Sequence, residues 1–280
     1  MRKLDIPSIV GKEKEIYIEC ARDFTRNKEY ARIALAYAKE VEKLSKEYVT
    51  YVPNNIGAFL HVDIENKEKK IINKVYEQKF VKKNSVGRKY YDIIMGNAKG
   101  RCPICGGGKL KNLDHFLPKS KYPLLCVTPL NLIPTCRDCN MGKGAEVSDD
   151  YYEIPFHPYL ETMNDKWVEC DLFFYSDGTF SVMFKNGYDA SLNPDLWKKY
   201  GAHMRINDLA STFNSRAEEE LENVRGLYKN ELLACGRQKI KTALVEIKES
   251  AEQIDVNSWK SALYRVLVRM CDEFCNWLEL

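Results

Sequence analysis

The sequence predicts a mainly α-helical protein with one small α+β insertion. Apolar residues recur at helical spacing within residues 12–50 and again from residue 193 onward, which indicates helical regions on both sides of the insertion. Residues 101–145 are instead rich in Gly, Pro and Cys, as expected of a unit that is held by a metal. At 280 residues the chain is long enough to form more than one core.

Residues 1–99 are expected to form a helical N-terminal region. Asn27 is a candidate N-cap within residues 12–50, and Pro53 ends the helical pattern. One or two further helices are expected in residues 66–97, where apolar residues are interleaved with lysines.

Positive charge is concentrated near the Cys-rich segment, although the whole chain carries a net charge of only +3. Residues 66–89 hold nine Lys or Arg against two Glu, and residues 101–145 hold seven against two acidic residues. The basic stretch is either a solvated helix face or a surface that contacts nucleic-acid phosphates without reading bases. Its position beside the Cys-rich segment favours the second interpretation.

A β-hairpin is expected in residues 151–190. Within the stretch WVECDLFFYSDGTFSVMFK (167–185), two apolar and aromatic runs flank Asp177 and Gly178, which together are a strong turn signal. The hairpin should therefore follow the Cys-rich unit directly in the chain.

Residues 191–280 are expected to form a C-terminal helical region. Helices are expected over 218–224 and 232–247, and an apolar stripe at helical spacing follows near the C-terminus. The region contains no set of residues that suggests catalysis, so we expect it to be a scaffold or a partner surface.

Neither a signal peptide nor a membrane span is expected. No apolar run approaches about 18 residues, and the first ten residues lack the apolar segment of a secretory signal. We therefore expect a cytoplasmic, reducing location, where closely spaced cysteines favour metal binding over disulfides.

Four of the ten cysteines form two CxxC pairs. Cys102 and Cys105 make the first pair, and Cys136 and Cys139 make the second, with 30 residues between them. Four thiolates are the ligand set that tetrahedral zinc prefers in structural sites, so the sequence predicts one structural zinc ion. The other six cysteines are expected to be small buried side chains: Cys20, Cys126, Cys170, Cys235, Cys271 and Cys275.

The segment between and after the cysteine pairs carries a specific motif. It reads LDHFLPKS (113–120), then NLIP (131–134), then CRDCNMGK (136–143). These residues resemble the HNH endonuclease family, whose ββα-metal unit has an Asp-His pair, an Asn-Leu, and a CxxC pair followed by His or Asn and then Lys. The resemblance implies that residues 100–150 form a zinc-stabilised ββα-metal unit.

The same resemblance implies roles for the polar residues of the motif. In this family the His of the Asp-His pair is the general base, which here is His115, and its ordinary pKa near 6.5 suits proton abstraction. Asp114 and Asn140 would bind one catalytic Mg²⁺ or Mn²⁺ through hard oxygen atoms. Asn131 would orient the base and its loop.

Two lysines of the motif, Lys119 and Lys143, would hold substrate phosphates. The remaining histidines are expected to have no role in catalysis. His61 lies in an apolar stretch, His157 is expected to pack in the interior, and His203 is expected on a helix surface.

The fuller stretches DHFLPKSKYP and NLIPTCRDCNMGKG look like the HNH nucleases of Septu-type anti-phage defence systems, including retron-associated ones. This narrower resemblance implies a bacterial nuclease that acts on DNA together with an ATPase partner of the SMC or ABC type. The chain has no Gly-x-x-x-x-Gly-Lys-Ser/Thr motif, so ATP hydrolysis would come from that partner. Two alternatives stay open: a nuclease that acts on RNA such as tRNA, and a non-catalytic zinc-dependent nucleic-acid-binding or scaffold protein.

Overall fold

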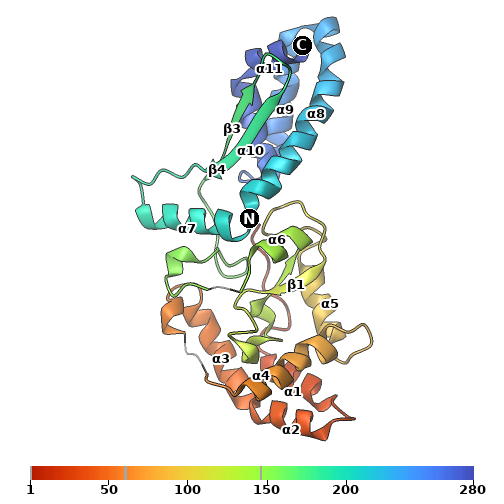
Figure 1. Ribbon diagram of the computed structural model, residues 1–280, viewed down its shortest axis with the longest axis vertical. Helices are drawn as coiled ribbons and strands as arrows, with labels where there is room; N and C mark the ends of the chain where they lie inside the picture. The colour runs from red at the N-terminus through yellow and green to blue at the C-terminus, as the bar shows by residue number, and fades with distance from the viewer. Residues whose placement is uncertain (1, 60–61, 146) are drawn as a thin grey trace. The chain divides into compact units, whose positions relative to one another are not determined.

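The computed structural model describes residues 2–59, 62–145 and 147–280, so His61 lies outside the described residues. These residues are mainly helical with two small antiparallel sheets, as the sequence predicts (Figure 1). The chain divides into two compact units, an N-terminal unit of residues 2–162 and a C-terminal unit of residues 163–280. The finer division at residues 99, 150 and 190 stays a prediction. None of the helices described is long and apolar enough to span a bilayer.

The N-terminal unit begins with three helices in the region where the sequence predicts helical structure. Asn27 caps the second helix, because its side-chain oxygen accepts a hydrogen bond from the backbone N–H of Tyr30 at 3.1 Å. The helices of this unit are α1 (Glu13–Arg22), α2 (Lys28–Ala36), α3 (Ala38–Tyr51), α4 (Asn66–Lys74), α5 (Arg88–Asn97) and α6 (Arg137–Gly142), with a π-helical turn η2 (Val75–Phe80) directly after α4.

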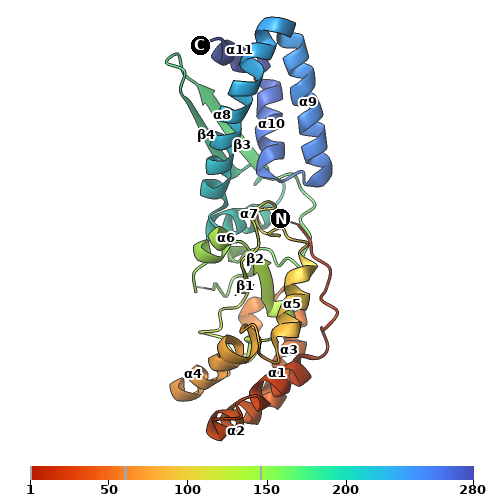
Figure 2. The same ribbon diagram turned by 90° about the vertical axis from the view of Figure 1, so that its right-hand side faces the viewer.

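The sheet of this unit lies in the segment that separates the cysteine pairs. Strand β1 (Asn112–His115) pairs antiparallel with β2 (Leu132–Thr135), which places His115 opposite Leu132. All four residues of β2 are buried, and both strands pack beside α5 (Figure 2). Helix α6 follows β2 after a single residue, so the chain runs strand, strand, helix through this segment.

The C-terminal unit contains the hairpin that the sequence predicts. Strand β3 (Val168–Phe174) pairs with β4 (Phe180–Asn186), and the turn is closed by Asp177, which accepts a hydrogen bond from the backbone N–H of Thr179 at 2.9 Å. One face of the hairpin is buried against helices of this unit. These helices are α7 (Pro194–Ile206), α8 (Leu209–Cys235), α9 (Arg237–Ile254), α10 (Trp259–Arg269) and α11 (Cys271–Glu279).

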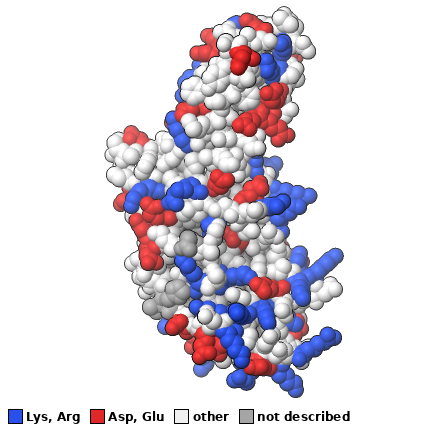
Figure 3. Space-filling model, viewed as in Figure 1, with Lys and Arg blue, Asp and Glu red and all other residues white. Residues whose placement is uncertain are grey.

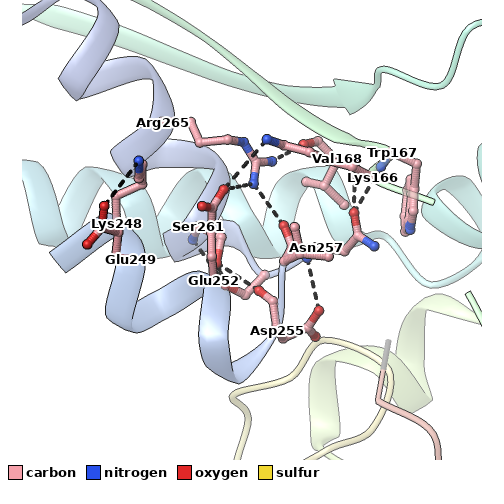
Figure 4. Close-up of polar contacts among 12 residues, drawn as sticks. Lys166, Trp167, Val168, Lys248, Glu249, Glu252, Asp255, Asn257, Ser261 and Arg265 are labelled. Carbon is pink, nitrogen blue, oxygen red and sulfur yellow. Dashed lines mark hydrogen bonds and ion pairs between the residues drawn. The ribbon is translucent and has the colours of Figure 1, made fainter. Parts of the chain in front are cut away.

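A group of hydrogen bonds and ion pairs, here called the polar joint, links the start of the hairpin to α9, α10 and the segment between them (Figure 4). Arg265 donates a hydrogen bond to the carbonyl oxygen of Val168 at 2.7 Å and forms an ion pair with Glu252 at 3.1 Å. The side-chain oxygen of Asn257 accepts a hydrogen bond from the backbone N–H of Trp167 at 2.9 Å. The joint therefore satisfies backbone groups that the hairpin alone would leave without partners.

The two helices expected over 218–224 and 232–247 are present as α8 and α9, but the break between them lies at Gly236, whose φ of +75° suits glycine. Two other expectations for this unit are wrong. Cys235 is exposed rather than buried. His203 is fully buried rather than on a helix surface, and this burial lowers the pKa of its imidazole well below the ordinary value.

Candidate functional site

The four cysteines of the two CxxC pairs come together as the sequence predicts. All four are buried, and their sulfur atoms lie within 4.8 Å of one another. The Sγ atoms of Cys105 and Cys136 are 3.8 Å apart. A tetrahedral zinc ion with Zn–S bonds of about 2.3 Å needs sulfur atoms about 3.8 Å apart, so the cluster has the size of a zinc site.

A tight turn and a helix end position these sulfur atoms. In the first pair, the backbone N–H of Gly106 donates to the carbonyl of Cys102 at 2.9 Å, and Gly106 has a φ of +75°. In the second pair, Cys136 stands immediately before α6 and Cys139 lies in its first turn. Two short and rigid segments therefore present two sulfur atoms each.

The buried cysteines shift one another's pKa in opposite directions. Hydrogen bonds from Cys102 and Cys139 lower the pKa of the Cys136 thiol to about 7. The hydrogen bonds among the sulfur atoms raise the pKa of Cys102 and Cys139, because they stabilise the protonated thiols there. Four buried thiols this close together are compatible with a structural zinc site.

A groove of about 450 Å³ opens in the N-terminal unit. Residues of β1 and α6 lie in its wall. Its lining brings together four of the residues that the sequence singles out: Asp114, His115, Lys119 and Asn140. Tyr76 from η2 adds an aromatic wall, and its ring centroid lies 4.5 Å from that of His115. The sequence does not single out Tyr76, because an aromatic residue among apolar helical residues has the pattern of an ordinary core residue.

His115 is held in one orientation and one protonation state. Its Nε2 lies 2.9 Å from the carbonyl oxygen of Cys126, which can only accept, so Nε2 carries the hydrogen and donates it. Nδ1 then has the free lone pair, and no described residue bonds to it. The ring is only 7% exposed, and burial lowers the pKa of His115 to about 3. The imidazole is therefore neutral at neutral pH and can accept a proton at Nδ1.

Asp114 and Lys143 form an ion pair at this site. Nζ of Lys143 lies 3.2 Å from Oδ2 of Asp114 and also donates to the backbone carbonyl of His115. Burial lowers the pKa of Lys143, while the Asp114 carboxylate opposes that effect. Lys119 is also paired, with Glu77, although it stays one third exposed at the groove. Both lysines therefore have partners within the chain.

Asn131 lies behind the groove and is completely buried. Its side-chain oxygen accepts the backbone N–H of Leu117 at 2.7 Å, and its amide group donates to the carbonyls of Leu117 at 3.1 Å and Leu125 at 3.3 Å. The residue thus bridges both ends of the loop that follows His115, and its role in orienting the base stays a prediction.

Two known proteins are similar to this chain. It is 30% identical to protein ea31 of Escherichia phage lambda over 227 residues, which cover 75% of this chain and 76% of that protein. It is 32% identical to the Septu protein PtuB of Bacillus thuringiensis over 113 residues, which cover 37% of this chain and 43%, less than half, of that protein. No family model matches the chain. No solved structure matches it.

Proposed function

The chain belongs to the family of protein ea31 of phage lambda, a name that states no activity, and we therefore propose its function from the groove itself. We propose that it is an HNH-type endonuclease, a metal-dependent enzyme that hydrolyses phosphodiester bonds. The single observation that carries this proposal is the placement of a neutral, oriented His115 in a groove with Asp114 and Asn140, directly beside a cysteine cluster of zinc-site size.

His115 is the proposed general base. Its Nδ1 would take the proton from an attacking water, while the Nε2–H keeps its hydrogen bond to the carbonyl of Cys126 and so stabilises the imidazolium that forms. An anionic phosphate in the groove would raise the pKa of His115 again, because a nearby negative charge favours the cationic ring. Substrate binding would therefore strengthen the base.

Asp114 and Asn140 are the proposed ligands of the catalytic ion. Both line the groove and offer one carboxylate and one amide, which are hard oxygen donors that suit Mg²⁺ or Mn²⁺ better than zinc. Few protein ligands are consistent with Mg²⁺, which keeps several waters and uses substrate phosphates as ligands. When bound, such an ion supplies Lewis-acid stabilisation of charge on the phosphate and the leaving oxygen. Lys119 is the proposed phosphate contact at the groove edge.

DNA is the proposed substrate, and an anti-phage role with an ATPase partner is the proposed setting. Exposed lysines are frequent in residues 66–89 of the N-terminal unit, the stretch that contains η2, and Figure 3 shows Lys and Arg side chains, with Asp and Glu among them, on one face of the molecule. The exposed members of this basic surface include Lys67, Lys70, Lys82, Lys83 and Lys89. The defence role is supported by the partial similarity to a Septu protein, and the ATPase partner by the motif resemblance.

The test is cleavage by the purified protein, with and without any co-purifying partner, of plasmid DNA and total RNA in Mg²⁺ or Mn²⁺. Wild-type protein should cut DNA, and His115→Ala should cut at least a hundredfold more slowly while keeping its zinc content. Cleavage of RNA alone would favour the RNA nuclease alternative. Equal cleavage by wild type and His115→Ala would remove His115 as the base, and zinc binding without any cleavage would favour the scaffold alternative.

A further inference from the structure

The buried amide of Asn131 uses every hydrogen-bonding capacity it has. An amide side chain offers two donors and two acceptor sites. The carbonyls of Leu117 and Leu125 take the two donors, and the N–H of Leu117 takes one acceptor site. The fourth partner comes from a distant part of the chain: the hydroxyl of Tyr48 on α3 donates to Oδ1 of Asn131 at 3.2 Å.

His157 fixes the direction of that fourth hydrogen bond. The backbone N–H of Tyr159 donates to Nδ1 of His157 at 3.2 Å, so Nδ1 is the accepting nitrogen and Nε2 carries the hydrogen of the neutral ring. Nε2 lies 3.0 Å from the hydroxyl oxygen of Tyr48, which therefore accepts from His157 and donates to Asn131. Tyr48, Asn131 and His157 are all completely buried. Donors in such a chain polarise one another in a low-dielectric interior.

This series of hydrogen bonds reaches the backbone on both sides that hold His115: Phe116, which follows it, and the segment at Cys126, which accepts from its ring. The backbone N–H of Phe116, the residue after His115, donates to the carbonyl of Asn131 at 2.8 Å. Asn131 also holds Leu125, the residue before Cys126, whose carbonyl accepts the Nε2–H of His115. A rotation of the Asn131 amide would therefore move the acceptor that determines which nitrogen of His115 carries the hydrogen.

We infer that Tyr48 and His157 are positioning residues of the proposed nuclease site: through Asn131 they lock the loop that orients His115. The inference rests on the proposed function, and it adds two residues that lie outside the motif, one on α3 and one after α6. Neither residue lines the groove, so their action is on the geometry of His115 rather than on the substrate.

Tyr48→Phe tests the inference, because it removes only the hydroxyl. We expect kcat for cleavage to fall about 10- to 100-fold with KM changed less than threefold, because the base is misaligned while the groove is intact. In protein labelled with ¹⁵N-histidine, solvent exchange of the His115 Nε2 hydrogen should become faster. Tyr17→Phe is the matched control, since the hydroxyl of the buried Tyr17 donates to the carbonyl of Ala34 at 3.1 Å, in the helical part of the same unit.

A second pair of variants covers the case in which Tyr48→Phe does not fold. His157→Leu removes the donor to Tyr48 and should lower kcat. His157→Gln can still donate an amide hydrogen, so its kcat should stay close to the wild-type value. The inference would be overturned if folded Tyr48→Phe had the kcat and the solvent exchange rate of the wild type. It would also be overturned if His157→Leu and His157→Gln lowered kcat equally. The wild-type protein could fail to cleave any nucleic acid while the Tyr48→Phe substitution still speeds solvent exchange at His115. In that case the proposed function fails and the positioning role stands.

Discussion

Nζ of Lys143 lies 3.2 Å from Oδ2 of Asp114, and the lysine side chain is only 8% exposed. The ammonium group also donates to the backbone carbonyl of His115, so two acceptors hold it in the interior. It supplies the positive charge that compensates the carboxylate of Asp114. A metal ion that uses Asp114 as a ligand must therefore compete with Lys143 for the negative charge of the same carboxylate.

Removal of this lysine should strengthen metal binding. Lys143→Met takes away the competing charge, and we expect the affinity for Mn²⁺ to rise about tenfold, or about 1.4 kcal/mol. Titration of Mn²⁺ followed by electron paramagnetic resonance measures this without nucleic acid and without cleavage. A phosphate that attracts Lys143 away from Asp114 should have the same effect, which would couple substrate binding to metal binding.

Lys119→Met is the matched control for that titration. It removes the same charge from a lysine that lines the groove but pairs with Glu77 instead of Asp114. Its Mn²⁺ affinity should stay within about twofold of the wild-type value. An unchanged or weaker affinity in Lys143→Met would show that Asp114 is not the ligand for which the lysine competes.

The cysteine cluster gives a second prediction. Cys139→Ser should abolish the binding of one zinc ion per chain and unfold the segment around β1, β2 and α6, because structural zinc contributes on the order of 10 kcal/mol to the folding of such units. Zinc content by mass spectrometry and a thermal melt followed by circular dichroism measure both effects. Cys235→Ser is the control, since Cys235 is exposed and lies outside the cluster. A Cys139→Ser variant that melts like the wild type would refute a structural role for the cluster.

The features that the sequence predicts correctly depend on residues that are close in the chain. The turn at Asp177 and Gly178, the cap at Asn27 and the spacing within each cysteine pair are all local, and each has a defined geometry. Residue spacing alone determines such contacts.

The features that the sequence does not reveal depend on contacts made by the folded chain. Tyr48 and Asn131 are separated by 83 positions, and Tyr48 lies in an apolar helical stripe where it has the pattern of a core residue. The ion pair between Lys143 and Asp114 is hidden for the same reason, since its partners are 29 positions apart and only the packing of α6 against β1 brings them together. Burial and pairing of polar groups are tertiary properties, which a motif does not specify.

The protonation state of His115 gives a third prediction, on stability. The pKa of His115 is lowered to about 3 in the folded chain, whereas an unfolded chain has the ordinary value near 6.5. Between these two pH values the unfolded chain binds a proton at this residue and the folded chain does not, so acid favours unfolding. The stability associated with neutral His115 is thus complete above about pH 6.5 and is lost as the pH falls toward 3.

Comparison with His115→Gln isolates this effect, because glutamine does not titrate. The free energy of unfolding, measured in urea between pH 5 and pH 8, should fall by about 2 kcal/mol more in the wild type than in the variant from pH 6.5 to pH 5. Above pH 7 the two curves should run parallel. Other titrating groups, including the buried His203, are present in both proteins and cancel in the difference. Parallel curves over the whole range would mean that His115 takes up its proton in the folded state, and that its ring is not held neutral by burial.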